Sequence, residues 1–401
     1  MDEDSGRGTT TGGGPPGAAP IGSTGTAGAV ENPATARSTA LLTGRGGNIS
    51  ALRGHNAALV LDLLRTAGPS GLSRPELAER TGLTPQAVSK IAARLRAEGF
   101  AADAGRRAST GGKPATALRL VPHAAHAIGL HLDRDQLTAV RTDLTGTAVA
   151  VHQAPLDLGA AAEDVLTGAC AAVDALRVEG ETALLGVGVA VPGPLDHRRG
   201  VLYRVTGHPQ WDGFPLRAAL RRRLGLPVAV DKDTDAAALG QALRPDQDPH
   251  PSFAYLHLGT GLGAGLVLDG RVYRGPRTGA GEFGHQVIQL DGPDCDCGNR
   301  GCIEALCRAA VARGALPEAA RVLGEGAANL VALLGVDRVL LGGRTITAHP
   351  APFLHGVAEV LAAHAARTGR RTPVPTTLAP GGPQTVAEGA AHLPLAPLFG
   401  H

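Results

Sequence analysis

DGPDCDCGNRGCIEAL, residues 291–306, places Cys295, Cys297 and Cys302 within eight positions of a chain that has only five cysteines. His285 precedes them by ten residues, in the stretch GAGEFGH. Three thiolates and one imidazole form a closed tetrahedral ligand set, the usual composition of a structural zinc site. The sequence therefore predicts a structural zinc bound by His285, Cys295, Cys297 and Cys302. A cluster of reduced, buried cysteines without metal is the alternative.

The overall composition is typical of a soluble globular protein. Of the 401 residues, 43% are hydrophobic and 18% are charged, which permits a large buried core. No apolar run approaches the length that crosses a bilayer, and the acidic start MDEDSGRGTTTGGGPPG lacks the apolar stretch of a secretory signal. We therefore expect a cytoplasmic protein with no membrane partner. Thiols stay reduced in that compartment, which favours metal binding over disulfide formation.

The N-terminal part of the chain divides into a polar arm and a basic module. Residues 1–50 are mostly Gly, Thr, Ser, Ala and Pro, which bury too little apolar surface to offset the entropy of ordering. We expect this arm to be disordered. Between Leu52 and Val121, eleven Lys or Arg stand against five Asp or Glu. Such a basic module on a near-neutral body indicates a nucleic-acid partner.

The pattern of residues 51–121 predicts a winged helix-turn-helix. Helices are expected over 55–67, 73–81 and 84–98, with Ser73 and Glu76 forming a capping box and Thr84 serving as an N-cap. Two strand-like pieces around a tip rich in Gly and Arg follow at 100–120. Three short helices and a hairpin in this order are typical of DNA-binding domains. A small helical domain with a solvated charged face is the alternative.

The third helix is expected to read the DNA. Val88, Ile91 and Leu95 share one face and should pack on the first two helices, which leaves the opposite face for base edges and phosphates. The expected DNA contacts come from this helix and from the tip of the wing: Thr84, Gln86, Ser89, Lys90, Arg94, Arg106, Arg107 and Lys113.

From residue 122 onward, buried strands alternate with helical segments, which predicts an α/β architecture. The expected strands are AIGLHLD, LLGVGVAV, LPVAVD, FAYLHLG and RVLLGG, at 127–133, 184–191, 226–231, 253–259 and 338–343. Several of them end in glycines, where loops would carry a site. Cys170 and Cys307 are expected to pack in helices rather than to bind metal.

The three motifs GTGLGAGLVLDGRVYRG (259–275), GAGEFGH (279–285) and CDCGNRGCIEAL (295–306) together resemble the signature of the ROK family of sugar kinases and sugar-responsive repressors. The helix-turn-helix and the wing STGGKPATALRL resemble the repressor branch, the xylose and N-acetylglucosamine type regulators. The resemblance implies a two-lobed, actin-like ATPase domain over 122–401, with sugar bound between the lobes. The small lobe would comprise about 122–245 plus the C-terminal helix, and the large lobe about 246–383. It also implies a homodimer or a dimer of dimers.

The resemblance also implies roles for individual side chains. Asp233, Glu282, His285 and Glu304 would bind sugar hydroxyls, with VPGP at 191–194 bordering the sugar. Carboxylates suit this task because each is able to accept hydrogen bonds from two hydroxyl groups. Kinases of the family use an aspartate at the position of Asp233 as general base, so this residue is a vestigial base candidate. Glu282 and Glu304 as plain surface charges are the alternative.

Three departures from the family pattern argue against catalysis and bear on the ligand. Kinase members carry Asp-x-Gly-Gly-Thr after the first strand, whereas GLHLDRDQL here places His131 at the aspartate and Asp133, Arg134 and Asp135 at Gly-Gly-Thr. Carboxylates there would repel phosphates, so we expect no kinase activity. The glycines of 259–265 and of LLGG at 340–343 would then persist for turn geometry alone. The stretch between Cys302 and Gly342 is also shorter than expected.

Lys232 and His208 stand where family members usually have Asn. An amide both donates and accepts hydrogen bonds, whereas lysine only donates. Either Lys232 pairs internally with Asp231 or Asp233, or the ligand is more acidic than a plain hexose, such as a sugar acid or a phosphosugar. Both residues are counted among the expected ligand contacts.

These features together predict a DNA-binding transcriptional regulator, a repressor of carbohydrate-metabolism genes controlled by a sugar-like effector in the cleft. Operator DNA and that effector are the expected partners. A sugar kinase with a DNA-binding arm and a ligand-independent DNA-binding protein with a degenerate cleft are the alternatives.

Overall fold

The computed structural model describes residues 54–106, 116–178, 183–203, 205, 207–244, 252–276 and 278–401. All of them fall within one compact unit, Ser38–His401. The arm predicted over residues 1–50 lies outside the described residues. In the described part of the chain, no helix combines the length and the apolar character that a membrane span requires.

The N-terminal module contains the three predicted helices, α2 (His55–Ala67), α3 (Arg74–Thr81) and α4 (Pro85–Ala97). The predicted capping box is confirmed: the Ser73 hydroxyl accepts from the Glu76 N–H, and the Glu76 carboxylate accepts from the Ser73 N–H at 2.7 Å. The Thr84 hydroxyl caps α4 by accepting from the Ala87 N–H at 3.2 Å. Local side-chain chemistry therefore sets where these helices begin.

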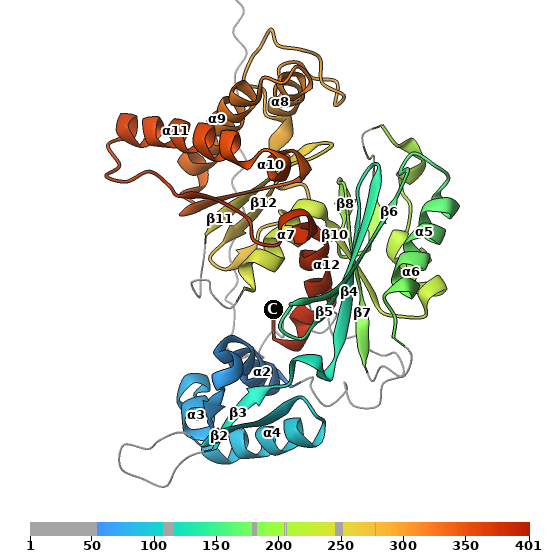
Figure 1. Cartoon of the computed structure of the whole chain (residues 1–401), viewed down its shortest axis with the longest axis vertical. Coiled ribbons are helices and arrows are strands. Elements are labelled where there is room, and N and C mark those ends of the chain that lie inside the picture. Colours follow the sequence, from blue (N-terminus) through green and yellow to red (C-terminus); the bar gives the residue numbers. More distant parts are fainter. Residues whose placement is uncertain are drawn as a thin grey trace, which may run out of the picture. The chain divides into compact units, whose positions relative to one another are not determined.

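A three-stranded antiparallel sheet completes the winged helix (Figure 1). Its order is β1 (Leu72–Ser73), β3 (Thr116–Leu120) and β2 (Ala101–Arg106), with Ala101 opposite Leu120. Arg106 is the last residue of β2. Of the wing residues predicted to contact DNA, Arg107 and Lys113 lie outside the described residues, as does the Arg106 side chain.

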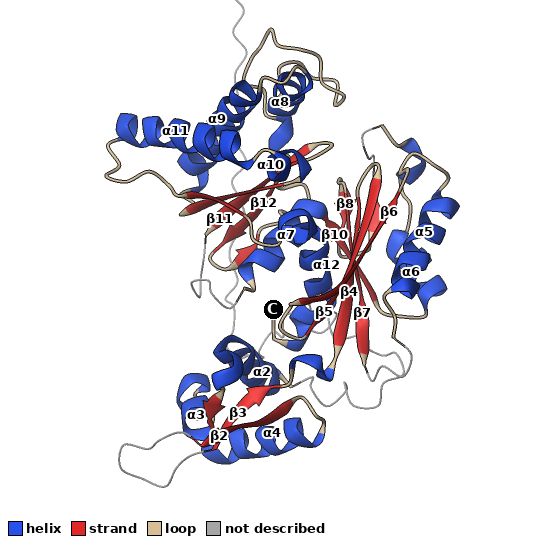
Figure 2. Cartoon of the chain, viewed as in Figure 1, coloured by secondary structure: helices blue, strands red, loops and turns tan. Residues whose placement is uncertain are grey.

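The first lobe of the larger domain is built on a five-stranded mixed sheet. The strand order is β10 (Val228–Lys232), β7 (Leu184–Val191), β4 (His126–Leu132), β5 (Gln136–Asp143) and β6 (Ala148–Pro155). Helices α5 (Ala162–Ala175) and α6 (Leu216–Leu224) lie on one side of this sheet, and α12 (Thr385–Leu395) lies on the other (Figures 1 and 2). The short strands β8 (Leu195–Asp196) and β9 (Val201–Leu202) form a hairpin nearby.

Two glycines in the central strands allow α12 to pack closely on the sheet. A Cβ added at Gly129 would lie 1.9 Å from the Ala387 carbonyl oxygen, and one at Gly188 would lie 1.8 Å from the Ala390 carbonyl oxygen. No side chain fits at either position. The C-terminal helix is therefore part of this lobe's core, although it is separated in sequence from the strands by about two hundred residues.

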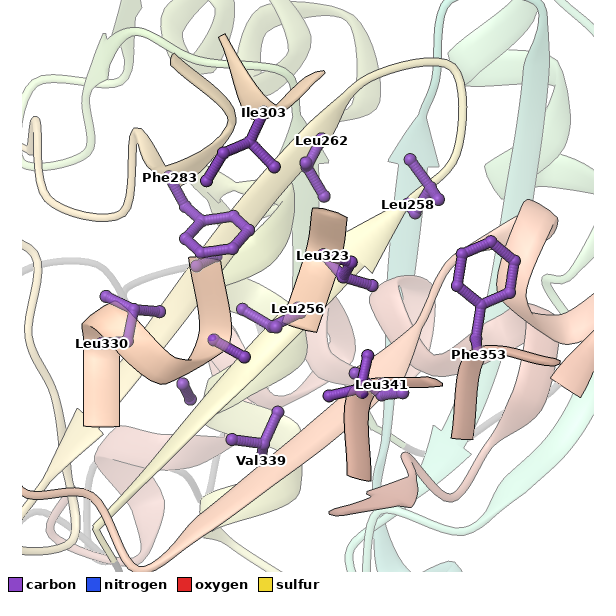
Figure 3. Packing of buried hydrophobic residues seen from close by; sticks show 14 of the residues in the cluster. Leu256, Leu258, Leu262, Phe283, Ile303, Leu323, Leu330, Val339, Leu341 and Phe353 are labelled. Carbon is purple, nitrogen blue, oxygen red and sulfur yellow. The ribbon is translucent and has the colours of Figure 1, made fainter. Parts of the chain in front are cut away.

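The second lobe is built on another five-stranded sheet. Its order is β13 (Arg271–Val272), β12 (Leu262–Leu268), β11 (Phe253–Leu258), β14 (Arg338–Gly342) and β15 (Thr376–Leu378). Phe283, Leu323 and Phe353 pack with the strand residues Leu256 and Leu341 in its core (Figure 3). The helices that supply this core are α8 (Ile303–Ala312), α9 (Leu316–Leu334) and α11 (Pro350–Thr368), and α10 (Arg344–Ala348) follows β14. Helix α7 (Asp233–Ala242) packs against β11 and β12.

All five predicted strands are present, each within two residues of its expected bounds. The fold is thus a winged helix followed by a two-lobed α/β domain of the actin-like type. The apolar core of the winged helix, however, extends beyond the winged helix itself. It continues into the C-terminal end of the chain, where Leu395, Leu398 and Phe399 belong to the same buried cluster as Leu61 and Leu64 of α2.

Arg65 of α2 reinforces this junction. Its side chain is 6% exposed and donates to the Asp62 carboxylate at 2.7 Å and to the Leu243 carbonyl oxygen. The guanidinium also lies 5.3 Å from the centroid of the Phe399 ring. The winged helix is therefore fixed to the end of α12 and to the residue that follows α7.

Candidate functional site

A cavity of about 610 Å³ is lined by residues of both lobes. Its walls include the ends of β4 and β10, the loop Pro192–Pro194, the glycine loop before β12 and the start of α8. This size is ordinary for a small-molecule site. All six predicted ligand contacts line it: Lys232, Asp233, His208, Glu282, His285 and Glu304.

Lys232 is neutralised inside the cavity wall. Its side chain is only 4% exposed; the ammonium donates to the Ala280 carbonyl oxygen and lies 3.5 Å from a Glu282 carboxylate oxygen. The expectation that an internal partner would be Asp231 or Asp233 was wrong. Asp231 pairs with Arg274 instead: the Arg274 Nε donates to an Asp231 carboxylate oxygen at 2.9 Å. Glu282 faces Lys232 because it lies at the turn before the short helix Phe283–His285.

Asp233 is the first residue of α7, directly after β10. One carboxylate oxygen accepts from the Thr234 N–H at 2.6 Å. Burial raises the pKa of Asp233 to about 7, and the nearby Lys232 ammonium only partly opposes that effect. A carboxyl group with this pKa is able both to donate to and to accept from a ligand hydroxyl near neutral pH.

Glu304 does not belong to the surface, which removes the alternative of a plain surface charge for this residue. Its side chain is 5% exposed, and one carboxylate oxygen accepts from the Leu262 N–H at 2.7 Å. The other oxygen lies 3.8 Å from Arg308. Glu304 therefore ties the start of α8 to the glycine loop. The Glu282 side chain, in contrast, is 45% exposed.

The predicted metal ligands converge. The donor atoms of His285, Cys295, Cys297 and Cys302 all lie within 4.8 Å of one another. The His285 Nδ1 is 3.7 Å from the Cys295 sulfur, and the Cys297 and Cys302 sulfurs are 3.8 Å apart. Ligands on a tetrahedral metal with bonds of about 2.3 Å lie roughly 3.8 Å apart, so the spacing fits a bound ion.

The backbone around these ligands requires glycine. Gly301 has φ 66°, and a Cβ there would lie 1.6 Å from the Gln289 carbonyl oxygen. Gly298 has φ 92°. Cys302 then caps α8, so its sulfur sits at the positive end of the helix dipole. Cys307 packs in the core of the lobe with its sulfur near the Ala319 carbonyl oxygen, outside the ligand group.

The region that corresponds to the first phosphate loop is filled by side chains. Asp133 accepts from the Thr260 hydroxyl at 2.7 Å and lies 3.3 Å from Arg344, which also pairs with Asp135 at 2.7 Å. The remaining space beside Arg344, His131 and Gly343 is about 10 Å³. That volume barely holds one water molecule.

The glycines of the loop 259–265 are required for a different reason from the one expected. None of its glycines has a positive φ, so turn geometry alone does not explain them. A Cβ at Gly265 would lie 2.1 Å from the Thr234 carbonyl oxygen, and one at Gly263 would lie 3.0 Å from the Thr234 side chain. These glycines allow β12 to pack closely on α7.

The candidate DNA-reading face of α4 is separated from its packed face. Val88, Ala92 and Leu95 are buried against the rest of the winged helix, whereas Ile91 is only partly buried. The predicted contacts Thr84, Gln86 and Lys90 are exposed, and Ser89 and Arg94 are partly exposed. The Arg94 Nε lies 3.9 Å from a Glu98 carboxylate oxygen.

The sequence did not reveal three arginines whose side chains join distant segments of the chain. Arg344, Arg274 and Arg65 each pair with groups far away in the chain, and nothing in their local sequence distinguishes them from other surface arginines. The one available signal for Arg344 was its place directly after the glycines of LLGG.

Two family profiles match the chain. Residues 127–313 match the ROK family and residues 54–108 match the MarR family. The first range runs from β4 to the end of α8, and it contains all four residues of the metal-ligand group. The second range covers the three helices and β2 of the winged helix.

The chain is similar to named transcriptional regulators. The xylose repressor of Bacillus subtilis (strain 168) is 29% identical over 237 residues, or 59% of this chain and 61% of that protein. The DNA-binding transcriptional dual regulator NagC of Escherichia coli (strain K12) is 31% identical over 264 residues, or 65% of this chain and 64% of that protein. The chain thus matches about three fifths of the length of the xylose repressor.

Solved structures share the fold. A ROK family transcriptional regulator, a homolog of the E. coli MLC protein, has a TM-score of 0.69 at 22% identity over 86% of this chain and 96% of its own. A ROK family glucokinase from Streptomyces griseus, in complex with glucose and AMPPNP, has a TM-score of 0.60 at 25% identity over 67% of this chain and 99% of its own. The chain is therefore similar to the ROK family over residues 127–313 and to the MarR family over residues 54–108, and it shares its fold with a ROK family transcriptional regulator.

Proposed function

We propose that the protein is a sequence-specific DNA-binding transcriptional regulator, a repressor of carbohydrate-metabolism genes, whose DNA affinity is controlled by a sugar in the 610 Å³ cavity. The observation that carries this proposal is the presence of a helix with an exposed polar face and of a cavity lined by carboxylates in one compact unit. Among its relatives, one is named a xylose repressor and another a DNA-binding transcriptional dual regulator, which supports this reading. A homodimer, or a dimer of dimers, would place two reading helices on successive turns of the operator.

The reading helix supplies the first test. Gln86→Ala and Lys90→Ala are each expected to weaken operator binding about 5- to 100-fold, because a side chain that bonds base edges contributes about 1–3 kcal/mol. The measurement is fluorescence anisotropy with a duplex that the protein itself selects from a random pool. Binding to an unrelated duplex serves as the control and is expected to change much less. Operator affinity equal to wild type in both variants would assign sequence reading to another surface.

The polar groups of the cavity support a sugar as the effector. Asp233, Glu282 and Glu304 offer carboxyl oxygens within one cavity, and His285 borders the same space. Because Glu282 neutralises Lys232, the lysine does not call for an acidic ligand, which favours a neutral sugar. Arg134 also lines the cavity, so sugar acids and phosphosugars belong in any comparison.

Ligand binding is expected to raise the melting temperature of the purified protein, since a ligand stabilises the state that binds it. The panel comprises neutral sugars, sugar acids and phosphosugars, each with and without Mg-ATP. One neutral sugar is expected to raise Tm, and Glu304→Gln is expected to remove that rise. Mg-ATP is expected to add nothing. A flat response to every sugar would instead favour the ligand-independent DNA-binding protein.

A zinc ion in the His285, Cys295, Cys297 and Cys302 group is part of the proposal, with a structural role. Three sulfurs and one nitrogen at tetrahedral spacing suit zinc, and no open position is left for a reacting molecule. Bound zinc would fix the loop before α8 and thereby hold Glu304 toward the cavity.

Sugar phosphorylation is the second candidate, and one observation favours it: Asp233, at the position of the kinase base, has a pKa of about 7. The ion pairs of Arg344 with Asp133 and Asp135 weigh against it, because they occupy the space that phosphates would need. Consumption of ATP that depends on any sugar of the panel would reverse this choice.

A further inference from the structure

A second cavity, of about 380 Å³, lies apart from the first and shares no lining residue with it. Three segments form its walls: the turn between β5 and β6, the C-terminal end of α7, and the face of α12 that carries Glu388 and His392. The volume falls within the ordinary range of small-molecule sites.

Two buried side chains present hydrogen-bond acceptors to this cavity. The Gln241 side chain, 3% exposed, donates one amide N–H to the Pro380 carbonyl oxygen at 3.0 Å, which leaves its second N–H and its carbonyl oxygen as the remaining groups. The His392 Nδ1 lies 3.0 Å from the Glu388 carbonyl oxygen. A carbonyl only accepts, so Nδ1 carries the proton and Nε2 is an acceptor. Burial lowers the pKa of His392 to about 4, which keeps the ring neutral.

Glu388 contributes the negative charge of the cavity. In the described part of the chain its carboxylate has no hydrogen bond and no ion pair within 4 Å. Burial raises the pKa of Glu388, and the guanidinium of Arg244 only partly opposes this effect. A desolvated carboxylate without a close partner is costly, and a bound cation would relieve that cost. One carboxylate and two neutral acceptors therefore line one space, together with the guanidinium of Arg244.

We propose that this second cavity binds a small organic molecule that carries a protonated amine. The ammonium group lies against the Glu388 carboxylate, and its remaining N–H donors, or hydroxyls of the same molecule, reach the Gln241 carbonyl oxygen and the His392 Nε2. The hydroxyls of Thr145 and Thr147, on the opposite wall, accept further donors. This site is independent of what the first cavity binds.

The walls of the cavity lead directly to the winged helix. Leu144 precedes the Thr145 wall and belongs to the winged-helix core, as does Ala391 beside His392. Leu243, one residue before the lining residue Arg244, accepts the hydrogen bond from Arg65 of α2. An amine in this cavity is thus placed to change how firmly the winged helix is fixed, independently of the sugar cavity.

The test uses the full chain, calorimetric titration with 1,4-diaminobutane or ethanolamine, and the diols 1,4-butanediol and ethylene glycol as neutral matches. At least one amine is expected to bind with millimolar affinity or better, and its diol at least tenfold more weakly. Glu388→Gln, which keeps the size of the side chain, is expected to weaken amine binding at least tenfold. Glu359→Gln, on the exposed face of α11, is the matched control and is expected to change nothing.

A second variant is designed to increase the affinity for the amine. Thr147→Asp adds a carboxylate at an exposed position of the same wall and is expected to tighten amine binding about twofold or more. Equal binding of amine and diol, no amine binding at all, or unchanged affinity in Glu388→Gln would each overturn the proposal. None of these results involves operator DNA or sugar, so the proposed function would stand or fall separately.

Discussion

Replacing Cys302 with serine is expected to release the bound zinc and to lower the Tm of the protein by about 10 °C or more. Cys302 is fully buried, it caps α8, and its sulfur lies 3.8 Å from that of Cys297. Structural zinc sites contribute their binding free energy to folding, so loss of one thiolate costs several kcal/mol, roughly 2–4 °C for each in a domain of this size. Metal content by mass spectrometry and thermal unfolding measure both effects.

Two other cysteines provide matched controls for this substitution. Cys307→Ser changes a buried residue of the same helix outside the ligand group, and Cys170→Ser changes a partly buried residue of the other lobe. Both are expected to retain one equivalent of zinc. A wild-type protein without zinc, together with an unchanged Tm in Cys302→Ser, would show that the cluster is a set of reduced cysteines and not a metal site.

Arg65→Met is expected to destabilise the winged helix by about 3 kcal/mol. The substitution keeps an unbranched side chain but removes both hydrogen bonds to Asp62 and the bond to the Leu243 carbonyl oxygen. That oxygen loses this partner in a mostly buried setting, and Asp62 keeps only His401, 3.5 Å away. It also removes the cationic contact with the Phe399 ring. Hydrogen exchange is expected to accelerate in α2 and in the last six residues together.

Arg80→Met is the control for this prediction, because Arg80 is an exposed arginine on α3 of the same module. It is expected to leave exchange in α2 unchanged. If Arg65→Met also leaves it unchanged, the C-terminal segment does not hold the winged helix, and the route from either cavity to DNA would need another path.

Local patterns predicted the features that local chemistry determines. The capping box of Ser73 and Glu76, the N-cap Thr84 and the four metal ligands lie close together in sequence, so spacing alone placed them. The five strands followed from short runs of apolar residues, two of which end in glycine. These features depend on neighbours within a few residues or within one loop.

Contacts between distant segments were not accessible in the same way. Arg344 meets Asp135 across 209 positions and Arg65 meets Leu243 across 178, and no spacing rule connects such pairs. For Lys232 the sequence left two alternatives, an internal pair with Asp231 or Asp233 or a more acidic ligand. In the structure its ammonium meets the Ala280 carbonyl oxygen and the Glu282 carboxylate instead of either aspartate. Gly263 and Gly265 are required because α7 approaches β12 closely at these positions. This contact joins segments that are apart in the sequence, so the sequence alone did not reveal why glycine is needed there.

The central claim is that the sugar cavity controls the DNA-reading helix, and operator affinity measured with and without the stabilising sugar tests it most directly. The two ligands must affect each other's binding equally if they are linked. The full-length protein is titrated onto its selected operator at fixed salt. At saturating sugar we expect affinity to fall at least tenfold, and Glu304→Gln to abolish the change. Unchanged operator affinity at a sugar concentration that fully shifts the Tm would contradict the account.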